Sequence, residues 1–253
     1  GPPAAAPEAA RPRLATPAPL LFSREYLPLT GERSYQPLVT LFHALAEGDL
    51  TLCRWAGVVL HALNAALVFL LGLSLLGDAR KAFLAGLLFA LYPPLTEALN
   101  ISAFKGHPLS FFFIASALLL WRRARLECAS SLRLAALAAF ALACLSKESA
   151  LVLPLLLAAH DLLVPDARPA GKKAWAGVAG LTGAYLFWRF GVLHPHPDTV
   201  APARGAFLSV ESLGWYAGRL FWPAPLCLET TLHPLLVSRI RPVLCNIMLD
   251  IGS

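Results

Sequence analysis

Charged side chains are scarce in this sequence. Only 14% of its 253 residues are charged, whereas a soluble domain usually carries about 25%. Hydrophobic residues make up 57% of the chain, and its mean hydropathy is +0.63. This shortage of charge favours a surface that faces lipid over the surface of a large soluble domain.

Cysteine is also rare, and its pattern argues against two structural devices. The five cysteines are odd in number and form no C-x-x-C pair, so neither a disulfide framework nor a zinc site is expected and they are interpreted as small apolar fillers. The chain has no G-x-x-x-x-G-K-[ST] or H-E-x-x-H motif and no 34-residue helical repeat. The chain has a net charge of +6, but its basic residues are not interleaved with aromatic residues that could stack on bases. No nucleic-acid partner is therefore expected.

The beginning of the chain has the composition of an unstructured arm. Residues 1–22 are rich in Pro and Ala and cannot bury enough apolar area to order themselves. The sequence does not begin with Met and contains no signal peptide. We therefore expect the chain to be part of a longer protein.

Residues 34–47 have the pattern of a short amphipathic helix within an outer loop, residues 23–50. Ser34 is a candidate N-cap, and Pro37 fits the first helical turn. Four apolar residues at helical spacing then share one face: Leu38, Leu41, Phe42 and Leu45. The stretch is too short and too polar to span a bilayer, which predicts a helix lying at the outer membrane interface.

Six apolar segments lie between Trp55 and Leu193, and the connections between them alternate in charge. One set of connections contains nine basic residues and the other only three. The nine are Arg80, Lys81, Arg122, Arg123, Arg125, Arg133, Arg168, Lys172 and Lys173, and the three are Lys105, Lys147 and Arg204. Because basic residues gather in cytoplasmic loops, the pattern predicts an all-α, polytopic membrane protein whose basic-poor connections face outward.

The predicted spans differ in how cleanly they cross. Residues 55–76 are long enough for a bilayer core, whereas residues 82–92 and 109–121 are short and must include polar residues to cross. Charge at membrane depth is tolerated only where it faces protein or water, so we expect a hydrated pocket that opens outward. The other segments are residues 132–146, 150–164 and 174–193, then 207–228 as a seventh span or an interfacial helix, and 231–253 without a clear pattern.

Residues suited to chemistry fall at the outer ends of these segments. Transfer of a sugar from a lipid phosphate needs a carboxylate as base or stabiliser and cations for the departing phosphate. The candidates are the carboxylates of Glu97 and Glu148, the cations Lys105, Lys147 and Arg189, and Tyr35 and His107 at the lip of the pocket.

Each candidate also has a plain structural interpretation. Glu97 can flank a helix end, Lys147 and Glu148 can form a polar hairpin tip, and Arg189 can extend to the lipid headgroups. In the first span, Asn64 more often holds helices together than binds substrate.

Several short segments together resemble one enzyme family, the transmembrane-and-tetratricopeptide-repeat O-mannosyltransferases and their bacterial relatives, which have the GT-C fold. The likeness covers roughly residues 20–230, and the order and spacing of the motifs are its most specific part. The segments are Ser34–Leu38, Leu60–Asn64, Pro94–Ala98 and Leu145–Glu148, followed by Trp188–Phe190 and Tyr216–Leu228.

The resemblance implies a transferase that takes a sugar, often mannose, from a dolichyl or polyprenyl phosphate donor and adds it to protein Ser or Thr. The reaction would lie on the luminal face of the endoplasmic reticulum or outside a bacterial inner membrane. The family's catalytic acidic pair belongs to its first outer loop, and no such pair occurs between Gly1 and Leu50. Gln36 stands where the family has Arg, Tyr92 where it has His, and Gly106 or His107 where it has an acidic residue.

We therefore predict the partial membrane core of a GT-C-like glycosyltransferase, residues 51–230. Lys105, Lys147 and Arg189 would contact the donor phosphate, while Glu97 and Glu148 orient those cations or the acceptor. No residue is singled out as a metal ligand. A non-catalytic membrane assembly protein is the alternative. A transporter is favoured less, because it calls for charges midway along spans and an inverted repeat.

Overall fold

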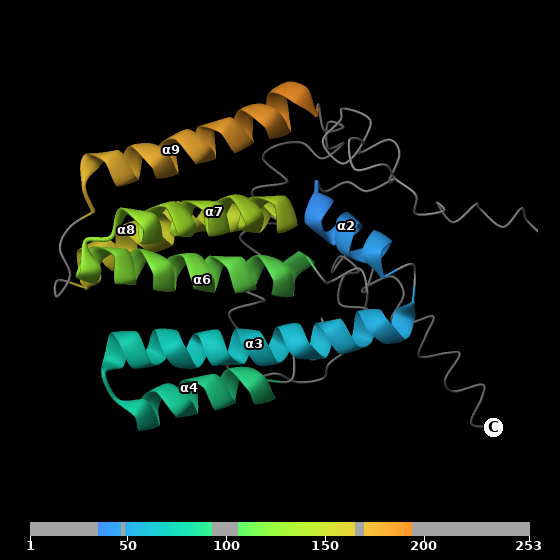
Figure 1. Cartoon of the computed structure of the whole chain (residues 1–253), viewed down its shortest axis with the longest axis horizontal. Coiled ribbons are helices and arrows are strands. Elements are labelled where there is room, and N and C mark those ends of the chain that lie inside the picture. The colour runs from blue at the N-terminus through green and yellow to red at the C-terminus, as the bar shows by residue number, and fades with distance from the viewer. Residues whose placement is uncertain (1–34, 47–48, 93–105, 165–169, 194–253) are drawn as a thin grey trace, which may run out of the picture. The chain divides into compact units, whose positions relative to one another are not determined.

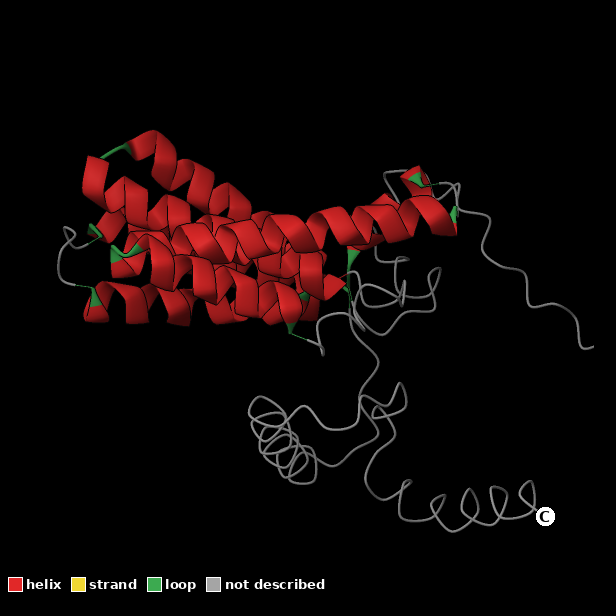
Figure 2. Ribbon diagram, turned by 90° about the horizontal axis from the view of Figure 1, so that it is seen from below, coloured by secondary structure: helices red, strands yellow, loops and turns green. Residues whose placement is uncertain are grey.

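The computed structural model describes residues 35–46, 49–92, 106–164 and 170–193. These residues form helices and short turns, with no strand among them (Figure 2), so the predicted all-helical fold class is confirmed. The chain divides into two compact units, residues 1–199 and 200–253, and every described residue belongs to the first. The predictions for residues 1–22, 207–228 and 231–253 fall outside the described residues.

The helices follow the predicted apolar segments closely. In the described ranges they are α2 (Pro37–Leu45), α3 (Leu50–Leu76), α4 (Ala79–Leu91), α6 (Gly106–Glu127), α7 (Ser130–Ser146), the 3-10 helix η3 (Glu148–Val152), α8 (Leu153–Leu163), α9 (Lys172–Leu186) and the π-helical segment η4 (Phe187–Val192). Figure 1 shows that consecutive helices from α3 to α9 run in alternating directions.

Short local signals set several of these helix ends. The Asp49 carboxylate accepts hydrogen bonds from the first amides of α3, and the Asp78 carboxylate does the same for α4, as N-cap residues do. Gly77 ends α3 at φ 66°, where glycine carries no steric penalty. At α2 the predicted cap was wrong, because Gln36 rather than Ser34 is the N-cap residue and Pro37 opens the helix.

Packing joins the helices in sequence. α3 packs against α4 and α6, α6 packs against α7 and α8, and α7 packs against α9. The core is centred on α6–α9, where Trp121, Phe140 and Leu153 are fully buried. Alanines along α7 let these large side chains fit between the helices.

The α3–α4 hairpin is held by small residues instead. A Cβ atom added at Gly72 would lie 3.2 Å from Ala82 Cα, and one added at Gly86 would lie 3.2 Å from the Ala65 carbonyl oxygen. Small residues that let backbones approach this closely are typical of helix pairs in membranes.

Large apolar side chains cover much of the outer surface of these helices. On α3 and α4, Trp55, Phe83 and Leu88 are each more than 60% exposed. α3, from Thr51 to Leu76, is long and apolar enough to cross a bilayer and is almost wholly unburied, whereas the apolar helix α7 is shorter. Of the helices in the described ranges, only α3 meets that criterion of length and composition.

The basic segment 122–133 was predicted as a loop, and that prediction was wrong. α6 continues through Arg122 and Arg125 to Glu127, leaving a turn of only Cys128 and Ala129 before α7. Arg122 and Arg125 are buried because each finds partners on a neighbouring helix, described below.

Candidate functional site

Five of the seven predicted site residues are described, and they lie at one end of the helices. Tyr35 precedes α2, His107 is in the first turn of α6, and Lys147 is the C-cap residue of α7. Glu148 opens η3, and Arg189 lies in η4. The segments that carry them are in contact, since α2 packs on α7 and η3 packs on both α6 and α7. Glu97 and Lys105 fall outside the described residues.

Glu148 is within electrostatic range of two other polar side chains, the His107 ring and the Tyr185 hydroxyl. The His107 ring is within electrostatic range of both Lys147 and Glu148. The Tyr185 hydroxyl is within range of Glu148 and Arg189. The neighbouring residues Lys147 and Glu148 therefore share one end of the molecule with Arg189, which comes from a distant part of the chain.

The turn between α7 and η3 holds Lys147 and Glu148 in place. Lys147 leaves the helix with an extended backbone, and its carbonyl accepts a hydrogen bond from the Ala150 amide at 3.1 Å. Ser146 and Ala150, on either side of the turn, are completely buried. The Ser146 hydroxyl donates to the Leu142 carbonyl at 2.8 Å. Buried neighbours on both sides fix the backbone while the two charged side chains stay half-buried.

Gln36, before α2, and Gly106, at the start of α6, lie against each other. Gly106 is buried under the Gln36 side chain, and a methyl group added there would overlap the Gln36 amide oxygen. The same added methyl would lie 3.3 Å from the Ser146 carbonyl oxygen. The absence of a side chain at Gly106 therefore leaves room for the Gln36 amide.

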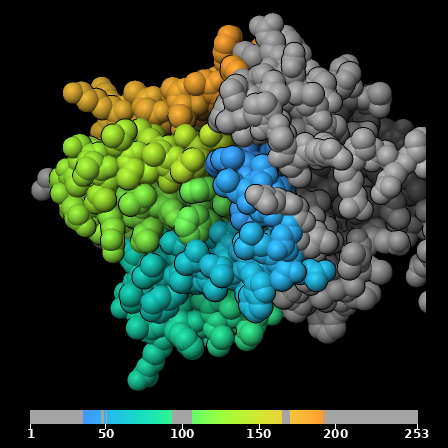
Figure 3. All heavy atoms as spheres, turned by 45° about the vertical axis from the view of Figure 1, so that its right-hand side comes forward, coloured from blue at the N-terminus to red at the C-terminus, as the bar shows by residue number. Residues whose placement is uncertain are grey.

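Tyr35 lies deeper than the predicted lip. It has no exposed surface and belongs to the buried core beside α7 and α9. Burial raises the pKa of the Tyr35 hydroxyl, and the nearby Trp188 indole opposes part of that shift. α2 packs against α7, and Figure 3 shows the blue atoms of α2 beside the yellow-green atoms.

An apolar groove of about 280 Å³ runs between α7 and α9 beside Tyr35. Cys144, Tyr185 and Trp188 contribute to its wall. The buried Tyr185 hydroxyl has no hydrogen-bond partner among the described residues. Sequence analysis missed Tyr185 because a tyrosine within an apolar segment gives no signal of its own.

A second cavity, of about 300 Å³, lies among α3, α4, α6 and η3. His61 and Asn64 line it and also join helices: the His61 Nε2 lies 3.1 Å from the Ala90 carbonyl oxygen, and the Asn64 amide donates to the Pro108 carbonyl at 3.0 Å. The helix-joining interpretation of Asn64 is therefore confirmed. Ser149, directly after Glu148, also lines this cavity, so residues on either side of the α7–η3 turn line the two hollows.

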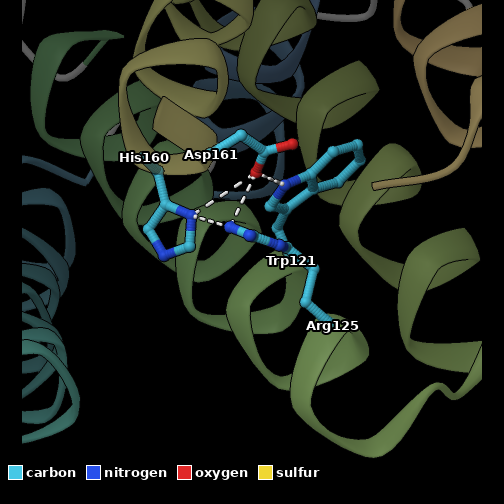
Figure 4. A network of polar contacts seen from close by, with 4 residues as sticks. All are labelled: Trp121, Arg125, His160 and Asp161. Atoms are coloured by element: carbon cyan, nitrogen blue, oxygen red, sulfur yellow. Dashed lines mark hydrogen bonds and ion pairs between the residues drawn. The ribbon is translucent and has the colours of Figure 1, made fainter. Parts of the chain in front are cut away.

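Sequence analysis also missed a polar network at the opposite end of the helices (Figure 4). The Asp161 carboxylate accepts a hydrogen bond from the Trp121 indole at 3.0 Å and pairs with the Arg125 guanidinium at 2.8 Å. Arg125 also lies 2.8 Å from His160 Nδ1. The available signal was Asp161 itself, because an acidic residue within an apolar segment needs a partner.

Arg122 is held in a similar way at that end. Its guanidinium donates to the hydroxyl and to the carbonyl of Ser74 on α3, each at 2.6 Å. Since Arg122 and Arg125 are engaged in these bonds, they tie helices together instead of forming a solvated basic loop.

The described ranges contain no group of three His, Cys, Asp or Glu side chains placed to hold a metal ion. Comparison of the chain with family models, with curated proteins and with solved structures finds no match.

Proposed function

We propose that this chain is the multi-pass, membrane-embedded core of a glycosyltransferase that uses a dolichyl or polyprenyl phosphate sugar, with mannose the first candidate. The membrane part of the proposal is supported by the apolar side chains on the outer surfaces of the helices. Soluble proteins rarely expose contiguous apolar patches of such extent. Lipid tails would cover these side chains and so remove the unfavourable exposure of apolar surface to water.

The antiparallel order of the helices supports a consistent orientation in the bilayer. Arg80, Lys81 and Lys172 lie at one end of the helices, while Lys147 and Arg189 lie at the other. By the positive-inside rule, the first end faces the cytoplasm. The second end then faces the lumen or the exterior, where the resemblance implies that sugar transfer takes place.

The observation that carries the enzymatic proposal is the position of the α7–η3 turn. Lys147 and Glu148 form this turn. Cys144 and Leu145, just before it, line the apolar groove, and Ser149, just after it, lines the cavity with polar groups. A lipid phosphate sugar has matching chemistry, because its phosphate joins an apolar chain to a hydroxylated ring. The apolar groove would suit the chain, the cations the phosphate and the polar cavity the ring. In this proposal Lys147 and Arg189 stabilise the negative charge of the departing phosphate.

Glu148 directly follows Lys147 in the chain, and it shares with Arg189 an electrostatic effect on the Tyr185 hydroxyl. It would accept the proton of the attacking Ser or Thr hydroxyl or hold the cations in place. Glu97 and Lys105 stay in the proposal as a second carboxylate and a third cation.

The test measures sugar release from mannosyl-phosphoryl-polyprenol by the full chain in liposomes, with a Ser- or Thr-containing peptide as acceptor. We expect Lys147→Ala to lower turnover by about 10²–10³-fold, because one stabilising charge is lost in the transition state. The matched control is Lys173→Ala, an exposed lysine in the first turn of α9. Undiminished turnover in Lys147→Ala would remove Lys147 from the site. A wild-type chain that binds the donor without turnover would favour the assembly role.

A further inference from the structure

The cavity among α3, α4, α6 and η3 has a polar group that finds no partner in the described part of the chain. Asn64 is 98% buried and donates its amide hydrogen to Pro108. This bond fixes the amide orientation, because a carbonyl oxygen such as that of Pro108 can only accept. The Asn64 Oδ1 then faces no hydrogen-bond donor among the described residues. Buried acceptors are usually paired, so one without a partner calls for an explanation.

Aromatic rings form another wall of the same cavity. His61, Phe89 and Phe111 stack in series, with ring centroids 5.6 Å and 5.1 Å apart and interplanar angles of 23° and 20°. All three rings line the cavity. A ligand held here meets flat apolar surfaces together with a hydrogen-bond acceptor, the combination of apolar walls and few polar groups that is typical of ligand pockets.

The size of the cavity limits the occupant. Its volume of about 300 Å³ lies at the lower end of the range for ligand pockets, roughly 300–1,000 Å³. A single monosaccharide ring suits a space of this size, and a polyprenyl chain does not. A sugar ring also offers both required surfaces, since its hydroxyl groups donate hydrogen bonds and its C–H faces pack against aromatic rings.

We propose that this cavity binds the sugar ring of the lipid-linked donor, with Asn64 Oδ1 accepting a hydrogen bond from a ring hydroxyl. The inference rests on the proposed function, because it places the sugar beside the turn that carries Lys147 and Glu148. Ser149 and Val152 are exposed on η3 and line the cavity, so the sugar would enter past them. Asn64 is a specificity residue in this arrangement and takes no part in the chemistry.

The test measures binding to the purified full chain in nanodiscs, with three probes: mannosyl-phosphoryl-polyprenol, polyprenyl phosphate and free mannose. Ser149→Phe and Val152→Phe each place a ring at the mouth of the cavity without altering a buried residue. The matched control is Ser131→Phe, an exposed serine in the first turn of α7. Two blocking variants are used so that a local disturbance of the turn by one of them is recognised.

We expect the wild type to bind the mannosylated lipid about tenfold more tightly than polyprenyl phosphate, from one added hydrogen bond and ring packing. Both blocking variants should remove that preference while binding of polyprenyl phosphate is unchanged, and Ser131→Phe should keep it. Equal binding of the two lipids, or a preference that survives both variants, would overturn the sugar assignment and leave the proposed function standing. If free mannose binds as tightly as the mannosylated lipid, the claim that the bound sugar is lipid-linked would be overturned. Failure to bind either lipid would overturn the proposed function and the inference together.

Discussion

Buried polar side chains form hydrogen bonds and an ion pair with one another far from the candidate site. Asp161 on α8 receives both the Trp121 indole N–H and the Arg125 guanidinium of α6, and the Arg125 and Asp161 side chains are 4% and 14% exposed. A buried ion pair adds little net stability over an apolar pair. Removing one member is costly, however, because the other is left charged and without its partner.

Arg125→Ala should therefore destabilise the protein by about 3–5 kcal/mol, the usual cost of breaking a buried pair. Arg123→Ala is the matched control, since this neighbouring arginine is exposed and its loss should change stability by no more than about 0.5 kcal/mol. The measurement is equilibrium unfolding in detergent. Equal effects of the two substitutions would mean that the Arg125–Asp161 pair is not formed in the folded protein.

Among the structural elements, the α3–α4 hairpin shows best how sequence becomes packing. Asp49, Gly77 and Asp78 set where the two helices begin and end, by capping bonds and one positive φ. The face on which the helices meet is set by Gly72 and Gly86, whose missing side chains admit the neighbouring backbone. The contact role of these glycines could not be predicted from the sequence, because apolar helices contain many small residues.

Gly86→Leu should separate α3 from α4, since the new side chain would collide with the Ala65 carbonyl and Phe69. Overpacking of this kind costs about 1–3 kcal/mol or more, seen as a lower midpoint of thermal unfolding. Gly183→Leu in α9 is the control, because a Cβ atom there meets nothing within 4 Å. If both variants unfold at the same temperature, the close approach of α3 and α4 is refuted.

At the scale of the whole molecule, the alternating helices place the turns at two ends. Cys128 is an exposed cysteine at the turn between α6 and α7, whereas Cys53 and Cys144 are buried. Ser149 is exposed at the opposite end of α7. If α6 and α7 cross the bilayer as proposed, these two positions lie on opposite sides of the membrane.

Labelling with a membrane-impermeant maleimide in sealed, right-side-out vesicles tests that arrangement. With Cys227 and Cys245 changed to Ser, Cys128 should react only after the membrane is permeabilised, because its turn belongs to the basic, cytoplasmic end. A cysteine introduced by Ser149→Cys in a Cys128→Ser background should react in intact vesicles. Labelling of both positions from the same side would contradict the multi-pass proposal.

The helices and the shared end of the candidate residues could be predicted from sequence. Apolar segment length and the Pro, Asp and Gly signals are local, so they place helix ends within a few residues. Alternation of direction then follows from short connections, which is why Tyr35, Lys147 and Arg189 were expected at one end. Glu97 and Lys105 were predicted by the same reasoning and fall outside the described residues.

The sequence by itself thus determined the all-helical class and the order of the helices, because these depend on residues close together in the chain. Only the tertiary structure decided that Arg122 and Arg125 are buried and that residues on either side of the α7–η3 turn line two different hollows. It also decided that Asn64 lines a cavity with its Oδ1 unpaired among the described residues. Each of these features depends on which distant segment packs against a residue, and that pairing is set by side-chain fit among several helices at once.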